Sequence, residues 1–130
     1  MLLAEFGMQS TLRNIFVYGS LKRGFSNHGL LVEQRFLATG HTQPRFKLYD
    51  LGNFPGMIEA AEGGRSIEGE IWQVDSSCLA QLEILEDTAH GLYARAPIHL
   101  LPPHADLAVE GYLYQLDITG RRELGERWTE

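Results

Sequence analysis

The sequence predicts one α+β domain, residues 1–130, in which helices pack against a closed or nearly closed mixed β-sheet. Three observations lead to this prediction. The chain has 130 residues and 44% hydrophobic content, which is enough for one core and too little for two. Short runs of β-branched and aromatic residues recur between turn residues, as the strands of a small sheet do. One segment carries leucines at helical spacing.

Six strands are predicted from apolar, β-branched or aromatic runs that end at glycine, proline or polar turn residues. They cover residues 14–18, 35–40, 45–51, 67–74, 93–101 and 107–116. Pro55-Gly56 is expected to be a turn. Gly69 lies inside the fourth run, and a glycine at such a position indicates close approach of the neighbouring backbone.

Two helices are predicted. A short one covers residues 27–32, with Ser26 or Asn27 as its N-cap. The longer one runs from Ser76 to about Glu86, and an N-cap is available in the segment 75–77. Its apolar face is formed by leucines that recur every three residues, at positions 79, 82 and 85.

Both ends are expected to add little to this fold. Residues 1–12 are predicted to be a flexible start, and residues 117–130 a tail appended to the domain. The first residues lack a positively charged region, and Glu5 interrupts their apolar run. We therefore predict neither a signal peptide nor a membrane span.

Composition excludes several classes of function. The net charge is -6 and no basic stripe occurs, so we expect no nucleic-acid partner. Cys78 is the one cysteine; it cannot form an internal disulfide, is expected in the core, and fits a cytoplasmic location. The five histidines are scattered without the spacing of metal ligands, so neither a metal nor another cofactor is predicted.

The loop after the first strand, Tyr18 to Gly24, is the first candidate site. A hydrophobic strand runs directly into Gly19-Ser20, and glycine allows the backbone to turn sharply and to approach a ligand closely. Successive amides in such a turn can bind a carboxylate. The spacing does not fit a phosphate-binding loop. Taken alone, these residues fit a tight turn without a ligand equally well.

This loop resembles the YGSL loop of the γ-glutamylcyclotransferase and AIG2-like families. The string Val17 to Gly24 carries the resemblance, together with Ile67 to Trp72 and Leu92 to Arg95. The closest branch is that of the γ-glutamylamine cyclotransferases, and the likeness spans residues 15 to about 114. It implies a small mixed β-barrel with flanking helices, in which Tyr18-Gly19-Ser20-Leu21 holds the α-amino acid end of a γ-glutamyl group.

The resemblance also implies a catalytic glutamate at the end of a helix written roughly Leu-Asp-x-Leu-Glu, a few residues before a Tyr-x-Arg strand. Residues 82–86 match this pattern and make Glu86 the candidate, with Glu83 in place of the usual aspartate. The gap to Tyr93 is one residue longer than usual. Counting backward from Tyr93 instead selects Asp87.

A third candidate base follows from the residues themselves. Alternation places Glu70 on one strand face with Glu68 and Trp72, and a tilt of that face would bring Glu70 into the barrel. The three carboxyl groups, Glu86, Asp87 and Glu70, stay open at this point, with Glu86 preferred because the leucine spacing fixes its place on the helix.

One carboxylate is enough for the implied reaction, because a γ-glutamyl substrate carries its own nucleophile, the α-amine. A base must deprotonate the ammonium, and the same group can return a proton to the leaving nitrogen. Burial beside Leu85 and Tyr93 would raise the pKa of Glu86 toward neutrality. Amides of residues 19–21, or the Tyr93 hydroxyl, could stabilise the oxyanion.

We therefore expect a transferase or lyase that releases 5-oxoproline and a free amine from a small γ-glutamyl substrate. Its predicted substrate-binding residues are Tyr18, Gly19, Ser20, Leu21 and Tyr93. The alternative is a non-catalytic module of the same fold that binds an amino-acid-like ligand. The identity of the leaving amine and the oligomeric state do not follow from the sequence.

Overall fold

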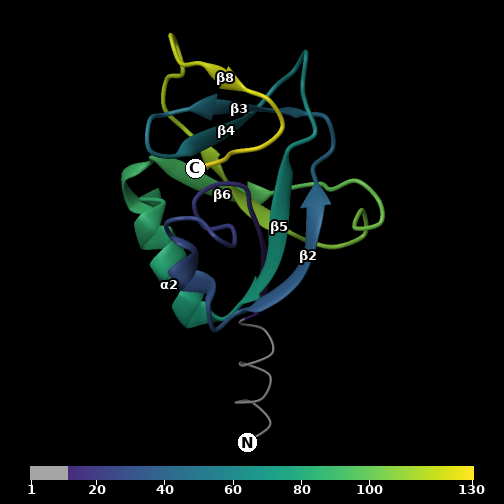
Figure 1. The fold of residues 1–130 in the computed structure, drawn as a ribbon, viewed down its shortest axis with the longest axis vertical. Helices are drawn as coiled ribbons and strands as arrows, with labels where there is room; N and C mark the ends of the chain where they lie inside the picture. The colour runs from purple at the N-terminus through teal and green to yellow at the C-terminus, as the bar shows by residue number, and fades with distance from the viewer. Residues whose placement is uncertain (1–11) are drawn as a thin grey trace, which may run out of the picture.

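The structure is a computed structural model that describes residues 12–130, so most of the predicted flexible start, residues 1–11, lies outside it. The described residues form two sheets, one α-helix and two short 3₁₀ helices (Figure 1). The strands are β1 Arg13–Val17, β2 Arg35–His41, β3 Phe46–Asp50, β4 Pro55–Glu59, β5 Glu68–Val74, β6 Tyr93–Pro97, β7 Glu110–Tyr114 and β8 Glu123–Leu124. The helices are η1 His28–Leu31, α2 Ser76–Leu85 and η2 Thr88–His90.

The larger sheet has the strand order β2-β5-β1-β7-β6 and the smaller one the order β4-β3-β8. All pairs are antiparallel except β1 with β7, which is parallel, so the sheet is mixed and the predicted α+β class is confirmed. The ladders among residues 12–130 do not close into one barrel. The two sheets instead meet by packing: a Cβ at Gly56 on β4 would lie 2.9 Å from Cβ of Tyr114 on β7.

Strand β1 divides the core. Ile15 and Val17 pack in one cluster with residues of α2 and η1, whereas Phe16 packs in a second cluster with residues of the smaller sheet. This alternation is the two-residue period of a strand that is buried on both faces. The close approach predicted at Gly69 is confirmed, because a Cβ there would lie 2.6 Å from the carbonyl oxygen of Val17.

The longer predicted helix is confirmed as α2. Its N-cap is Asp75, whose carboxylate accepts a hydrogen bond of 2.8 Å from the Cys78 amide. Cys78 and Leu82 are buried, and Figure 1 shows the helix flanking the sheets. The segment predicted as a short helix forms the 3₁₀ turn η1 instead, and Asn27 does not cap it with its side chain.

Two expectations about the rest of the chain are wrong. Pro55 and Gly56 begin strand β4 rather than form a turn, because both pair with β3. Residues 117–130 are part of the fold: β8 pairs with β3, Trp128 is buried, and the Glu126 carbonyl accepts a hydrogen bond from the Glu68 amide. Within residues 12–130, no helix is both long and apolar enough to cross a membrane.

Candidate active site

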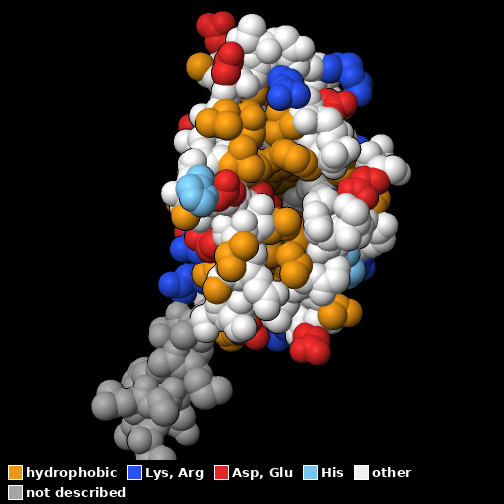
Figure 2. All heavy atoms as spheres, turned by 90° about the vertical axis from the view of Figure 1, so that its left-hand side faces the viewer, with side chains coloured by type: hydrophobic (Ala, Val, Ile, Leu, Met, Phe, Trp, Pro, Cys, Tyr) orange, Lys and Arg blue, Asp and Glu red, His pale blue; other side chains and the backbone are white. Residues whose placement is uncertain are grey.

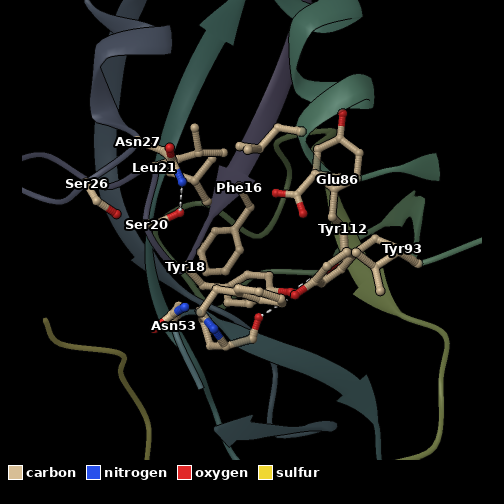
Figure 3. Close-up of a pocket in the computed structure, with 16 residues that line it drawn as sticks. Phe16, Tyr18, Ser20, Leu21, Ser26, Asn27, Asn53, Glu86, Tyr93 and Tyr112 are labelled. Atoms are coloured by element: carbon tan, nitrogen blue, oxygen red, sulfur yellow. Dashed lines mark hydrogen bonds between the residues drawn. The ribbon is translucent and has the colours of Figure 1, made fainter. Parts of the chain in front are cut away.

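A cavity of about 270 Å³ lies where β1 ends, between its loop and the end of α2 (Figure 3). Figure 2 shows a face of the molecule on which hydrophobic side chains gather around a hollow. The six residues predicted as the site all line the cavity, namely Tyr18, Gly19, Ser20, Leu21, Glu86 and Tyr93. The other lining residues are Phe16, Val17, Ser26, Asn27, Asn53, Phe54, Pro55, Leu85, Leu92 and Tyr112.

The loop after β1 supplies backbone donors to this cavity. A turn is closed by a 3.1 Å hydrogen bond from the Lys22 amide to the Gly19 carbonyl. Within residues 12–130, the amides of Gly19, Ser20 and Leu21 have no hydrogen-bond acceptor. Glycine is required at position 19 for close approach rather than for a positive φ, because a Cβ there would lie 2.9 Å from Pro55 Cγ. The free amides can bind an anionic group.

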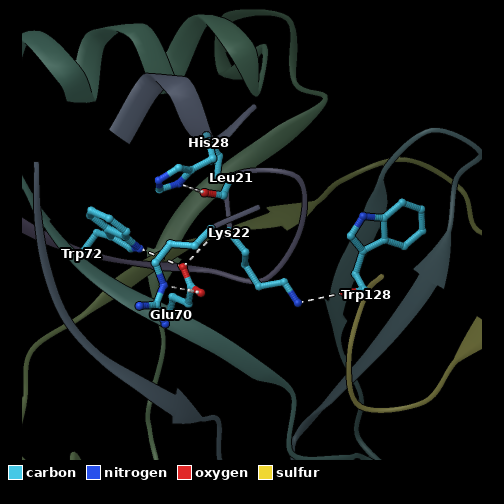
Figure 4. Close-up of polar contacts among 7 residues, drawn as sticks. Leu21, Lys22, His28, Glu70, Trp72 and Trp128 are labelled. Carbon is cyan, nitrogen blue, oxygen red and sulfur yellow. Dashed lines mark hydrogen bonds and ion pairs between the residues drawn. The ribbon is translucent and has the colours of Figure 1, made fainter. Parts of the chain in front are cut away.

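Side chains hold this loop in shape. The Asn27 amide group donates to Ser20 Oγ at 2.8 Å, and the Asn27 backbone amide donates to the Ser20 carbonyl at 2.8 Å. His28 Nδ1 lies 3.0 Å from the Leu21 carbonyl oxygen, and Lys22 Nζ donates to the Trp128 carbonyl at 2.9 Å (Figure 4). Burial lowers the pKa of Lys22. The loop is therefore tied to η1 and to the C-terminal segment.

Glu86 follows the last residue of α2, and its backbone amide still donates to the Leu82 carbonyl at 2.9 Å. Its carboxyl group points into the cavity (Figure 3). No donor within residues 12–130 forms a hydrogen bond with that carboxyl group. Burial, and secondly the charge of Glu83, raise the pKa of Glu86 to about 7. A carboxyl group in this state can both take up and release a proton near neutral pH.

Tyrosines close the cavity beside Glu86, and their hydroxyl protons are already in use. Tyr18 donates to the Tyr112 carbonyl and Tyr93 donates to the Pro55 carbonyl, each at 2.6 Å. Burial raises the pKa of both phenols, so they stay neutral. Because Tyr93 uses its proton in this way, its hydroxyl is not free to donate to an oxyanion, an alternative that the sequence had left open.

The two rival carboxyl groups do not line this cavity. Glu70 is 8% exposed and accepts three hydrogen bonds of 3.1 Å, from the Arg23 amide, Arg23 Nε and Trp72 Nε1. Burial raises the pKa of Glu70, but these donors together bring it below its usual value. Asp87 has a left-handed backbone, with φ of 51°, and its carboxylate lies 2.5 Å from His90 Nδ1 at the surface.

Sequence reasoning missed Tyr112, which forms part of the cavity wall beside Glu86 (Figure 3). Its place on β7 depends on the parallel pairing of β7 with β1, in register Ile15 with Glu110. No local pattern in the sequence encodes that pairing. The one available signal was the alternation of Tyr112 and Tyr114 on a predicted strand, which puts both on the same face.

Comparisons with known proteins point to one family. A family model described as gamma-glutamyl cyclotransferase, AIG2-like matches residues 15–130. A Vibrio cholerae protein named "Putative gamma-glutamylcyclotransferase" is 48% identical over 73 residues, which cover 56% of this chain. The gamma-glutamylcyclotransferase family protein YtfP of Escherichia coli is 33% identical over 82% of this chain and 86% of its own length.

Among solved structures, that of a uropathogenic E. coli-specific protein superposes with a TM-score of 0.75 at 29% identity. The superposition covers 89% of this chain and 90% of that one. The chain spans 61% of the length of the Vibrio relative.

Proposed function

This chain belongs to the gamma-glutamyl cyclotransferase, AIG2-like family, and we propose that it is an enzyme releasing 5-oxoproline and a free amine from a γ-glutamyl amine or amide. The proposal includes intramolecular attack by the α-amine of the substrate, with Glu86 as proton shuttle. Neither a metal nor another cofactor enters any step. The predicted cytoplasmic location belongs to the same proposal.

In the proposed reaction the substrate α-carboxylate binds the amides of Gly19, Ser20 and Leu21. Glu86 takes a proton from the α-ammonium, and the freed amine attacks the γ-carbonyl carbon. A carbon–nitrogen bond forms in the ring, and the bond from the γ-carbon to the leaving nitrogen breaks. Of the three ammonium protons, one stays on the lactam nitrogen and two end on the leaving amine, carried there by Glu86. No water is consumed.

One observation carries the proposal: the carboxyl group of Glu86, which accepts no hydrogen bond from residues 12–130, lines the same cavity as a loop whose amides have no acceptor among those residues. The pKa of Glu86, about 7, suits a group that must act first as base and then as acid. Holding both ends of the glutamyl group brings amine and carbonyl together, and oriented intramolecular reactions reach effective molarities of about 10⁵ M or more.

The test is a panel of γ-glutamyl amides with different leaving amines, incubated with the enzyme and examined by mass spectrometry. We expect 5-oxoproline and the free amine as products. Free glutamate in place of 5-oxoproline would mean attack by water and would contradict the cyclisation. Binding of these ligands without any turnover would instead support the non-catalytic module.

Three isosteric variants identify the proton shuttle. We expect Glu86→Gln to lower kcat by about 10³-fold while leaving substrate affinity nearly intact, because general acid–base catalysis contributes about 10² to 10⁴. Asp87→Asn is the matched control, since asparagine also tolerates the left-handed backbone at that position. Glu70→Gln tests the remaining carboxyl group. If turnover were lost in Asp87→Asn or in Glu70→Gln but not in Glu86→Gln, the assignment of Glu86 would be overturned.

A further inference from the structure

Glu83 lies one turn before Glu86 on α2, and side chains three residues apart on a helix share a face. It does not line the cavity. Its carboxylate instead accepts a hydrogen bond of 2.5 Å from the hydroxyl of Tyr112. Tyr112 itself lines the cavity together with Glu86. The proposed mechanism gives Glu83 no task, although it is a partly buried charge next to the shuttle.

We propose that Glu83 is a positioning residue for the proposed reaction: it fixes Tyr112 as the wall beside Glu86 and places a second negative charge behind that carboxyl group. The role of Glu83 in catalysis rests on the proposed function. The structural part of the inference does not depend on turnover. It states that two like charges lie one helical turn apart and that a hydrogen bond joins Tyr112 on β7 to Glu83 on α2.

The counter-charge available to Glu83 is shared. Arg95 Nη1 lies 3.5 Å from Glu83 Oε1, and Arg95 Nε lies 3.5 Å from Glu110 Oε1. Close charged pairs have nitrogen–oxygen distances of about 2.7–2.9 Å, so neither contact is a tight one. Because one guanidinium is shared between two carboxylates at these distances, Arg95 offsets the negative charge of Glu83 only in part.

The three tyrosines that line the cavity with Glu86 carry no charge at neutral pH. Tyr18 at the start of the loop, Tyr93 on β6 and Tyr112 on β7 all line the cavity with Glu86. Burial raises the pKa of each phenol, and the charge of Glu86 raises it further. Two charged side chains next to these elements have other partners: Lys22 Nζ donates to the Trp128 carbonyl, and the Asp87 carboxylate lies beside His90 Nδ1.

A like charge disfavours ionisation, so Glu83 holds protons on Glu86 up to higher pH. Burial is the larger cause of the raised pKa of Glu86, and Glu83 is the second. Without Glu83, the carboxyl group would ionise earlier, remain ionised through the neutral range, and become a poorer proton donor to the leaving amine.

The experiment is a ¹³C NMR titration of the Glu86 carboxyl group in wild type and in Glu83→Gln. We expect the midpoint to fall by about one pH unit in the variant, the shift that a like charge a few ångströms away at a protein surface produces. The rising limb of kcat/KM should move in the same direction. Glu83→Asp keeps the charge and should keep the midpoint near that of wild type.

Glu110→Gln is the matched control, because it removes the other acid on Arg95 without touching Tyr112, and its shift should be much smaller. An unchanged Glu86 midpoint in folded Glu83→Gln would overturn the inference. An equal shift in both variants would do so as well, since it would trace the effect to Arg95. The titration needs no substrate, so this failure is distinguishable from an absence of 5-oxoproline in the panel.

Discussion

Glu70 and Glu86 are glutamates on opposite sides of one loop, and they differ in the donors that reach them. Glu70 receives three hydrogen bonds, from Arg23 and Trp72, whereas Glu86 receives none within residues 12–130 (Figures 3 and 4). Burial acts on both carboxyl groups in the same direction, yet the pKa of Glu70 is lowered and that of Glu86 is raised to about 7. Burial alone therefore does not select a base; the number of donors does.

The comparison also separates two tasks. Glu70 stays ionised and anchors the loop through the Arg23 amide, two residues after the free amide of Leu21. Glu86 accepts no hydrogen bond from residues 12–130, which leaves its carboxyl group available for the proton exchange that we propose. We expect substitutions at the two sites to differ in kind: those at Glu70 should damage the fold and the loop, and those at Glu86 should damage the chemistry.

The largest effect on stability is expected at Glu70. Glu70→Ala leaves the buried Trp72 indole and the Arg23 amide without their acceptor, and we expect the free energy of unfolding to fall by about 3 kcal/mol. Urea denaturation measures this change. Glu70→Gln should cost less, because its amide oxygen can still accept the two bonds made to Oε1. Equal losses for both variants would mean that the negative charge, rather than the acceptor, carries the effect.

Glu86→Gln should change stability in the opposite direction, and only at high pH. The folded protein raises the pKa of Glu86 from 4.5 to about 7, so it loses stability as pH rises through this window and the carboxyl group ionises. The variant cannot ionise, so at pH 8 we expect it to be more stable than wild type by about 2 kcal/mol, allowing for partial exposure. At pH 4 the two should be equal.

The free energies of unfolding of wild type and Glu86→Gln are measured by thermal or urea unfolding at pH 4 and at pH 8. The control is Glu59→Gln, which removes the same charge from an exposed position. If the free energy of unfolding of Glu86→Gln relative to wild type did not rise between pH 4 and pH 8, the folded protein would ionise Glu86 without loss of stability. The contrast between the raised pKa of Glu86 and the lowered pKa of Glu70 would then be wrong, whatever the assay of turnover shows.

Sequence patterns identified the parts of the site that depend on local structure. The strand that ends in Tyr18-Gly19 and the helix that ends before Glu86 each have a short-range signal, the apolar run and the leucine spacing. Strand alternation also placed Glu70 and Trp72 on one face, where they are hydrogen-bonded. Alternation does not say which cavity a face borders, so the structure was needed to show that Glu86, and not Glu70, lines the cavity.

What escaped prediction depends on contacts between distant residues. The pairing of Pro55 and Gly56 with β3, the docking of Trp128 and the parallel register of β1 with β7 are set by packing, with no local signal. Whether a sheet closes into a barrel also depends on contacts between distant residues. The alternation of apolar and polar side chains can indicate a strand but not its neighbours, which is why the predicted barrel became two sheets packed together.

The smallest predicted effect tests one donor. Trp72→Phe keeps an aromatic ring beside Phe36 but removes the indole hydrogen bond to Glu70, so the pKa of Glu70 should be lowered less. Stability from a depressed carboxyl pKa is present above the unfolded pKa and is lost as pH falls through the folded value. The pH-dependent part of the loss should therefore be about 1 kcal/mol at neutral pH and vanish in acid.

Trp128→Phe is the matched control, because its indole lies 3.5 Å from Glu130 and makes at most a weak bond. Both variants lose ring volume, so a loss common to the two, and constant with pH, reports packing alone. The difference between their unfolding curves as pH falls isolates the Glu70 bond. If that difference stayed constant from neutral pH to acid, the Trp72 donor would not set the pKa of Glu70, and the backbone and side chain of Arg23 would account for its ionisation.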